Sequence, residues 1–585
     1  MRLEEYWGVG PKTREVLADA IGEPAAIEAI ESADSRALMA AGLSRGRATR
    51  ILRRAQGGEG MDVLATRDTR DVYKDILDLA SEHAVTRHAE DRIRVLTPLR
   101  DRAAMTDRLE TVLDAIDAWD TLDADTQSAV VDAFEAHDSI EGGERSAVRT
   151  ALALLDTGVS GGVFDRLDPL DADALADAAD ALAALGDGRV GEGADDRLDT
   201  LRDQQVAVEE LAANQADVLE TAQEGARGTD EFREAFVRHV ADETGITMTA
   251  VREAMPQDAT DATGFVSETL RTLADDSRQA VTERADEVAS DLEGAIETAR
   301  EDIDAAVAAV DDIAFYVSLA RFALAYDLSP PTFVDDRETI AVADARNLDL
   351  VAADSQTVQP ITYAVGDHSL DVASADAPPV GDQVTVLTGA NSGGKTTVLE
   401  TLCQVQLLAQ MGLPVPAAAA EVSVVDVVVF HRRHASFNAG VLESTLRTVV
   451  PPLSSDARTL MLVDEFEAIT EPGSAADLLH GLVTLTVERD AMGVFVTHLA
   501  DDLEPLPEQA RTDGIFAEGL TPDLELAVDY QPRFGTVGKS TPEFIVSRLV
   551  ADAEDRRERA GFETLAHAVG EEAVQRTLAD ARWTN

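Results

Sequence analysis

The spacing of apolar residues predicts long helices through the middle of this 585-residue chain. From about residue 61 to 330, alanine, leucine, aspartate and glutamate dominate, and the only prolines before Pro330 in this part are at positions 98, 169 and 256. Such a composition favours helices. In the clearest stretch, the apolar residues follow one another mainly at steps of three, four and seven: Val266, Leu270, Leu273, Val281, Val288, Leu292, Ile296, Ile303, Val307, Val310, Ile313 and Val317.

A continuous helix over this stretch would be roughly 75–90 Å long at 1.5 Å per residue. We expect it to act as a lever or to pack as a coiled coil. A passive helical spacer would have the same pattern, so the sequence leaves both functions open. The glycine pair Gly161-Gly162 and the glycine-rich run from Gly186 to Gly193 indicate turns between helices.

Short apolar runs in the last third of the chain predict buried strands instead. These runs are Val384–Leu387, Leu460–Val463 and Val494–Val496, and the first is followed by Val398–Leu402, which opens a helix. Runs of this length with polar ends are typical of strands that are covered on both faces. We therefore expect a multidomain protein with an all-α middle and a C-terminal α/β domain.

The first of these strands leads into a complete phosphate-loop pattern. Its residues are Gly389, Ala390, Asn391, Ser392, Gly393, Gly394, Lys395 and Thr396, followed by Thr397. The glycines allow backbone N–H groups to close around phosphates, Lys395 would pair with the β/γ oxygens, and Thr396 would ligate Mg²⁺. The chain contains only four lysines, at positions 12, 74, 395 and 539, and one of them stands where a nucleotide site requires it.

The other two strands end in residues that suit an ATPase. Asp464 and Glu465 close the second strand, about 70 residues after the phosphate loop. In this order Asp464 would hold Mg²⁺, and Glu465 would polarise the attacking water. His498 closes the third strand and is a candidate sensor of the γ-phosphate or the water. A histidine that merely caps the strand end is the alternative.

Composition narrows the class of protein. The formal net charge is −61 and the acidic residues are spread along the chain, which indicates a solvated acidic shell suited to a very salty cytoplasm. The hydrophobic content of 45% argues against a mostly unfolded chain. The single cysteine, Cys403, excludes a disulfide framework and a cysteine-based zinc site. Without a bilayer-length apolar run or a signal-peptide core, we expect a cytoplasmic protein with no membrane partner.

Residues 1–56 differ from the rest of the chain in charge, because they contain nine Lys/Arg and eight Asp/Glu. Two similar glycine-containing turns lie here, and each resembles a helix-hairpin-helix motif, which points backbone N–H groups at a DNA phosphate beside a basic residue. The candidate DNA-binding residues are Gly8, Gly10 and Lys12 in the first turn and Gly42, Arg45, Arg47 and Arg50 in the second. Glycines that only end helices, beside a solvated basic face, are the alternative.

The nucleotide motifs together resemble the MutS family of DNA repair ATPases. The Asn391-containing loop, the pair Asp464-Glu465 with the following Thr470-Glu471-Pro472, and Thr497-His498 are similar to the family's loop, Walker B strand with D-loop, and switch histidine. Further similar segments are Ala345 to Leu348, where the family has A-R-H-P, and Gly538-Lys539-Ser540 with Phe544 to Leu549. The segment from His434 to Glu443 resembles the family signature loosely, with Ser436, Asn438 and Glu443 as candidates for contacting a partner's ATP.

Together with the glycine-containing turns and the helical pattern, the resemblance leads us to expect four regions: a DNA-binding head (1–56), a helical lever or clamp (61–330), an ABC-type P-loop ATPase domain (335–550) and C-terminal helices (551–585). The ATPase domain is the part that the resemblance itself implies. It also implies ATP and Mg²⁺ as cofactors, a homodimer with composite ATP sites, and a nucleoid-associated clamp on double-stranded or branched DNA. The N-terminus lacks the family's mismatch-inserting Phe-x-Glu, and Phe232 to Glu234 is a chance match. We therefore expect a branch of the family without mismatch recognition. Residues 541–585 read as two polar helices rather than the small nuclease domain of some relatives, so we also expect no nuclease activity.

Two alternatives remain open. A chromosome-structure ATPase of the SMC or RecN type also joins long helices to a composite ATP site, but its two nucleotide motifs would flank the helices. Here both motifs follow the helices, between Gly389 and Glu465. The second alternative is a DNA scaffold in which ATP binding only locks the dimer, and a measurement of ATP turnover would distinguish it from an enzyme.

Overall fold

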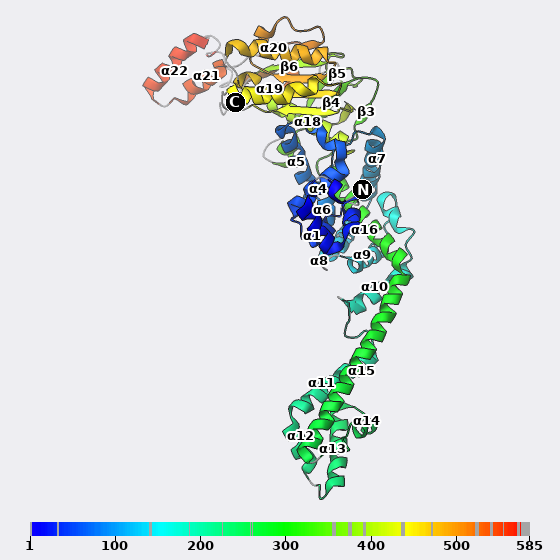
Figure 1. Ribbon diagram of the computed structural model, residues 1–585. Coiled ribbons are helices and arrows are strands. Elements are labelled where there is room, and N and C mark those ends of the chain that lie inside the picture. The colour runs from blue at the N-terminus through cyan, green and yellow to red at the C-terminus, as the bar shows by residue number, and fades with distance from the viewer. Residues whose placement is uncertain are drawn as a thin grey trace. The chain divides into compact units, whose positions relative to one another are not determined.

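The computed structural model divides the chain into two compact units (Figure 1). The first comprises residues 1–127, 160–165 and 312–585, and the second comprises residues 128–159 and 166–311. The structure describes residues 3–569 and 574, except 7, 32–33, 140–142, 187, 225, 258, 260, 354–357, 373–376, 390–393, 434–438, 470–471, 521–525, 539–541 and 554. The helical middle that the sequence predicts is thus shared between the two units.

The second unit is a helical arm. Figure 1 shows the shorter helices α11 to α14 gathered along one end of the long helix α15. Its elements are the end of α8 (Ala124–Ser139), α9 (Glu144–Thr157), part of η3 (Gly162–Leu167), α10 (Ala172–Ala184), β1 (Leu185–Gly186), β2 (Arg189–Val190), α11 (Asp196–Ala213), α12 (Gln215–Gln223), α13 (Thr229–Thr244), α14 (Met248–Glu253), α15 (Ala262–Thr298) and the start of α16 (Arg300–Ala325).

The long helical pattern of the sequence folds as two helices rather than one. An interruption at Ala299 separates α15 from α16, so the expectation of a single continuous helix is wrong in this detail. The apolar positions of α15 pack as the pattern predicts, because Val266, Leu270 and Leu273 lie in one core cluster with residues of α11 to α14. The predicted turn near Gly186 is the short antiparallel pair β1–β2.

The first unit begins with helices that surround a small core. Positive φ values at Gly8 (83°) and Gly42 (98°) mark the two turns that precede α1 and α4, a conformation that favours glycine. The elements are η1 (Leu3–Glu5), α1 (Pro11–Ile21), α2 (Glu23–Glu31), α3 (Ser35–Ala40), α4 (Arg45–Gly57), η2 (Gly58–Val63), α5 (Arg67–Ser81), α6 (Arg87–Arg94) and α7 (Arg102–Asp120). Val95, just after α6, belongs to the same core cluster as the residues of α1 to α4.

Two sheets form the rest of the first unit. The larger has the strand order β12-β11-β6-β10-β9-β8, and all neighbouring strands are parallel except β11 and β12. The smaller has the order β3-β7-β4-β5. The strands are β3 (Thr332–Val334), β4 (Thr339–Ala345), β5 (Ile361–Gly366), β6 (Val384–Gly389), β7 (Ala419–Ser423), β8 (Val427–His431), β9 (Thr459–Asp464), β10 (Met492–Val496), β11 (Ala510–Leu520) and β12 (Leu526–Arg533).

Helices cover both faces of the larger sheet, as its uninterrupted apolar strands predict. Alternate residues of β9 point to opposite faces: Leu460 and Leu462 pack in the cluster that contains α18, while Met461 and Val463 pack with α20. The helices are α17 (Leu348–Ala352), α18 (Lys395–Gln410), α19 (Ala439–Leu453), η4 (Phe466–Ile469), α20 (Pro472–Glu488), η5 (Ala500–Leu503), α21 (Pro542–Asp552) and α22 (Arg556–Val569). Among the described helices, none is both long and apolar enough to cross a bilayer.

Candidate active site

The predicted site residues meet at one edge of the larger sheet. Strands β6, β10 and β9 are parallel neighbours, so Gly389, Thr497 and Asp464 stand at or just beyond their adjacent carboxyl ends. In open α/β sheets this edge is where ligands bind. The three motifs, which are up to about a hundred residues apart in sequence, are therefore brought together by the strand order.

The two described ends of the phosphate-loop segment are tied to each other. Lys395, the first residue of α18, is 4% exposed, and its Nζ donates a hydrogen bond to the backbone oxygen of Gly389 at 2.9 Å. Gly389 has a φ of 133°, and a Cβ there would lie 2.3 Å from the backbone oxygen of Ile515, so the position requires glycine. Ala390, Asn391, Ser392 and Gly393 lie outside the described residues.

Thr396 and Asp464 form a pair that fits a magnesium ion. The Thr396 hydroxyl donates to Oδ2 of Asp464 at 2.7 Å, while the buried Oδ1 of Asp464 has no hydrogen-bond partner among the described residues. A buried carboxylate oxygen without a partner is costly, and hard oxygen donors are the ligands that Mg²⁺ prefers. Burial raises the pKa of Asp464 and lowers that of Lys395, so both charges would gain from a bound counter-ion.

Glu465 is held on both carboxylate oxygens. Its Oε1 lies 3.0 Å from Nε2 of His498, and its Oε2 lies 2.7 Å from Nη1 of Arg433. The hydrogen bond to His498 is the main cause that lowers the pKa of Glu465, and Arg433 adds to it. Glu465 also has a φ of 41°, which is uncommon for a residue other than glycine and is a form of backbone strain found at functional sites.

The backbone of His498 is hydrogen-bonded to a carboxylate that the sequence did not predict as part of the site. Oε1 of Glu467, in the η4 turn, accepts hydrogen bonds from the backbone N–H of His498 at 2.7 Å and from the hydroxyl of Thr497 at 2.9 Å. Arg433 was missed as well. The available sequence signals were a third acidic residue two positions after Glu465, and a basic residue two positions after the apolar run that forms β8.

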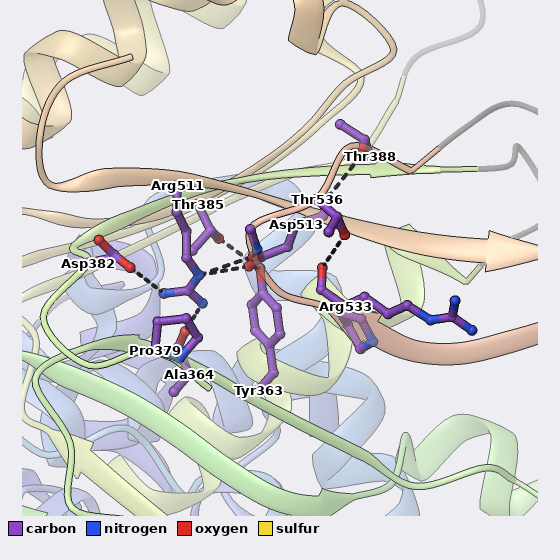
Figure 2. Close-up of polar contacts among 12 residues, drawn as sticks. Tyr363, Ala364, Pro379, Asp382, Thr385, Thr388, Arg511, Asp513, Arg533 and Thr536 are labelled. Atoms are coloured by element: carbon purple, nitrogen blue, oxygen red, sulfur yellow. Dashed lines mark hydrogen bonds and ion pairs between the residues drawn. The ribbon is translucent and has the colours of Figure 1, made fainter. Parts of the chain in front are cut away.

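A buried polar network anchors the strand that leads into the phosphate loop (Figure 2). Figure 2 shows the Arg511 guanidinium between Asp382 and Asp513, with Nε of Arg511 3.0 Å from Oδ2 of Asp513. The Tyr363 hydroxyl of β5 is 2.9 Å from both Oδ2 of Asp513 and the Thr385 hydroxyl of β6. Asp513 is fully buried, and this burial raises its pKa while Arg511 opposes the rise. The network joins β5, β6 and β11, strands of both sheets.

The end of β6 is tied to the chain beyond β12 by further contacts. The Thr388 hydroxyl donates to the backbone oxygen of Asp513 at 2.9 Å and accepts from the backbone N–H of Gly538 at 2.6 Å. Gly394, which precedes α18, has a φ of 73°, and a Cβ there would lie 2.8 Å from the ring of Tyr530. Tyr530 is 40% exposed, so an accessible aromatic ring borders the segment. The sequence analysis did not identify it.

The remaining predicted ATPase residues are placed only in part. Thr397 lies in the first turn of α18, and Glu443 is an exposed residue of α19 that pairs with Arg447 at 2.7 Å. Ser436, Asn438 and the segment Thr470-Glu471 lie outside the described residues, as do Lys539 and Ser540. The assignment of a residue to a partner's ATP therefore stays a prediction.

The DNA-binding candidates of the head lie on its surface, but not all are free. The two glycine turns come together because Arg47 of the second donates a hydrogen bond to Thr13, which follows the first. A cavity of about 260 Å³ between them is lined by Gly8, Arg47, Arg50 and Ile51. The remaining candidates are Gly10 and Lys12, exposed at the start of α1; Gly42, exposed in the second turn; and Arg45, paired with Glu90 at 2.9 Å and Asp91 at 2.8 Å.

Comparison with known proteins agrees with this geometry. A family model described as MutS domain V matches residues 385–511, which include Lys395, Asp464, Glu465 and His498. The DNA-binding protein MutS2 of Pyrococcus furiosus is 42% identical over 213 residues, 36% of this chain and 36% of that relative. Residues 385–511 therefore match the MutS family. This confirms the family that the motifs predicted.

Other MutS relatives carry different names. The endonuclease MutS2 of Thermomicrobium roseum is 30% identical over 232 residues, 37% of this chain and 26% of the relative. The DNA mismatch repair protein MutS of Salinibacter ruber is 32% identical over 204 residues, 32% of this chain and 21% of the relative. The chain thus spans between about one fifth and just over one third of the length of these MutS relatives.

Proposed function

We propose that this chain is an ATP-hydrolysing, DNA-binding protein of the MutS type. The observation that carries the proposal is the convergence of Lys395, the Thr396–Asp464 pair and the Glu465–His498 pair at adjacent strand ends. A phosphate-binding lysine, a site for a divalent cation and a carboxylate aimed by a histidine are the parts that phosphoryl transfer to water requires.

Each residue has a definite role in this proposal. Lys395 binds the β/γ-phosphate oxygens once it leaves the backbone oxygen of Gly389, and Thr396 with Asp464 holds Mg²⁺. The magnesium ion would neutralise charge on the phosphates. Glu465 accepts a hydrogen bond from the attacking water, and His498 keeps the carboxylate oriented. The pKa of Glu465 is lowered, so this residue stays ionised at neutral pH and acts by polarising the water rather than by holding a proton.

The second part of the proposal is that the head binds the backbone of double-stranded or branched DNA. Support comes from the exposed N-terminal ends of α1 and α4, the exposed Lys12 and the cavity lined by Arg47 and Arg50. Backbone N–H groups at helix N-termini bind phosphates without reading the base sequence. We further propose a homodimer that acts in DNA repair or recombination, with ATP turnover resetting its grip on DNA.

Steady-state ATP hydrolysis in molar KCl with Mg²⁺ tests the proposal. We expect turnover by the wild type, a change in rate when duplex or four-way DNA is added, and loss of turnover in Lys395→Ala. The matched control is Lys74→Ala, because Lys74 is exposed on α5 and pairs with Asp78 at 3.4 Å. Binding of ATP without any turnover would instead favour a scaffold whose dimer is locked by ATP.

A further inference from the structure

Glu467 contacts neither the Thr396–Asp464 pair nor Glu465 in any described hydrogen bond, yet it is hydrogen-bonded to the backbone of His498. One oxygen of its carboxylate receives two hydrogen bonds, from the Thr497 hydroxyl at 2.9 Å and from the His498 backbone N–H at 2.7 Å. These donors are consecutive residues just after β10. The carboxylate therefore bridges the η4 turn, which follows Glu465, and the segment that follows β10.

The Glu467 hydrogen bonds restrict the position of the His498 side chain. With the backbone of His498 fixed, Nε2 of its ring lies 3.0 Å from Oε1 of Glu465. The backbone N–H of Glu465 in turn donates to the oxygen of Val496 at 3.0 Å, so the two strand ends are also joined two residues before His498. A hydrogen bond from a backbone N–H to an ionised carboxylate is among the stronger ones in proteins.

We propose that Glu467 is a positioning residue for hydrolysis, which acts by holding His498 against Glu465. This inference rests on the proposed ATPase activity. Glu467 touches no reacting group in this account, and its effect on turnover passes entirely through His498. It differs in this from Glu465, whose carboxylate would polarise the attacking water in the proposed reaction.

The rival role for Glu467 is direct participation as a third carboxylate at the site. Its Oε2 is buried and has no hydrogen-bond partner among the described residues. The charge of Glu467 also acts on Lys395, whose pKa it raises against the lowering effect of burial. A glutamine at position 467 separates the two roles, because its amide oxygen can accept the same two hydrogen bonds but carries no charge.

The test is a double-mutant cycle on steady-state turnover in the full chain, with Glu467→Ala, Glu467→Gln, His498→Ala and the two double variants. We expect Glu467→Ala to lower kcat by about 10- to 100-fold, the loss typical of a misplaced group, with little change in the Kd for ATP. Glu467→Gln should retain most of the wild-type kcat. In the His498→Ala background, neither substitution should lower kcat further.

Three results would overturn the inference. The first is a loss in Glu467→Gln as large as in Glu467→Ala, which would show that the charge itself is needed. The second is a loss from Glu467→Ala that persists undiminished in the His498→Ala background. The third is an unchanged kcat in a folded Glu467→Ala variant.

Controls distinguish a wrong role for Glu467 from a failure of the proposed ATPase activity or of folding. Glu488→Ala removes an exposed carboxylate from α20 and should leave kcat and the melting temperature unchanged. The melting temperature of each variant shows whether it is folded. If the wild type itself did not hydrolyse ATP, the proposed activity would be wrong, whereas an active wild type with an additive cycle would reject only the role of Glu467.

Discussion

The sheet-containing part of the first unit and the helical arm use the same acidic composition in different ways. Around the sheets, Asp464 and Asp513 are buried, and burial raises the pKa of each. In the arm, ion pairs such as Arg278–Glu209 and Arg252–Glu234 lie between exposed side chains. Exposed pairs contribute little to stability, whereas buried charges must be paired or bind a ligand.

This difference shows where to look for chemistry in a highly acidic chain. The number of carboxylates is no guide, because most of them are solvated. The informative carboxylates are those that the fold withdraws from water at the ends of parallel strands, such as Asp464 with its unpartnered oxygen among the described residues. The arm offers structural pairs instead, as in Asp195 and Arg284, whose atoms lie 2.7 Å apart.

The largest effect on stability should follow the loss of Asp513. In Asp513→Ala, the Arg511 side chain, which is 8% exposed, would lose its nearest carboxylate and keep the more distant Asp382 at 3.4 Å and the backbone oxygen of Ala364 at 2.6 Å. Removing one partner of a buried ion pair costs about 3–5 kcal/mol. Scanning calorimetry should show an earlier transition for the first unit and an unchanged one for the arm.

The control for this prediction is the double variant Arg511→Met with Asp513→Ala, which removes both charges and should recover part of the lost stability. If Asp513→Ala melted like the wild type, the buried network of Figure 2 would not hold the sheets together, and the contrast with the arm would lose its main support.

The next effect concerns rate. Glu465→Gln keeps the size of the side chain but weakens its ability to polarise water, so we expect kcat to fall by about 100- to 1000-fold while ATP still binds. Turnover and equilibrium nucleotide binding are measured on the same preparation. Near-normal turnover in this variant would show that Glu465 is not the residue that polarises the water.

A smaller effect is expected for DNA binding by the head. Lys12→Ala should weaken binding of duplex and four-way DNA several-fold and lower the salt dependence by about one phosphate contact. Arg14→Ala is the matched control, because this substitution also removes one positive charge from α1. In the wild type, however, Arg14 already pairs with Glu23 at 2.7 Å. Gel shifts at several KCl concentrations measure both. Equal losses in the two variants would indicate a general charge effect rather than a contact at the turn.

Point variants test the head better than its deletion. If the head binds DNA, deletion of residues 1–56 should weaken DNA binding and largely spare the basal ATPase. However, Asp91 of α6 is buried and accepts hydrogen bonds from Ser35 and Arg45 at 2.8 Å each. Deletion would leave this carboxylate without those partners, so a loss of DNA binding could reflect damage to α6.

The smallest effect should come from the arm. The hydrogen bond from Arg284 lowers the pKa of Asp195 to about 2 from an ordinary value of 3.8. The Asp195–Arg284 pair therefore contributes its full stabilisation of the folded state when the pH is above the ordinary pKa of Asp195. That contribution is lost as the pH falls towards 2. In Asp195→Asn, amide protection in α11 should drop slightly at pH 7, and the difference from the wild type should shrink on acidification. A difference that grew at low pH would contradict this pairing.

The sequence could nominate the main residues of the candidate site because their signals are local. A glycine-rich turn between an apolar strand and a helix, and a strand that ends in two carboxylates, identified Lys395, Asp464 and Glu465 without a structure. Glu467 and Arg433 were missed because their roles depend on which strand ends become neighbours in the sheet. The paired state of Arg45 was missed for the same reason, since Glu90 and Asp91 are about 45 residues away in sequence.

The sequence predicted the types of secondary structure in each region, but not how the chain divides into two compact units. Helical periodicity predicted the arm and apolar runs predicted the sheet, because both patterns report which faces are buried. Neither proline nor glycine stands at Ala299 or directly beside it, so the local sequence does not predict the break between α15 and α16. The assignment of the middle of the chain to two units likewise depends on long-range packing.

The central claim is that this strand edge binds a magnesium–nucleotide complex through Lys395. Equilibrium binding of labelled ATP in molar KCl, with and without Mg²⁺, tests it most directly. The account predicts saturable binding by the wild type and by Glu465→Gln, weaker binding without Mg²⁺, and loss of binding in Lys395→Ala. Folded wild-type protein that takes up no nucleotide, or a Lys395→Ala variant that binds as well as the wild type, would contradict it.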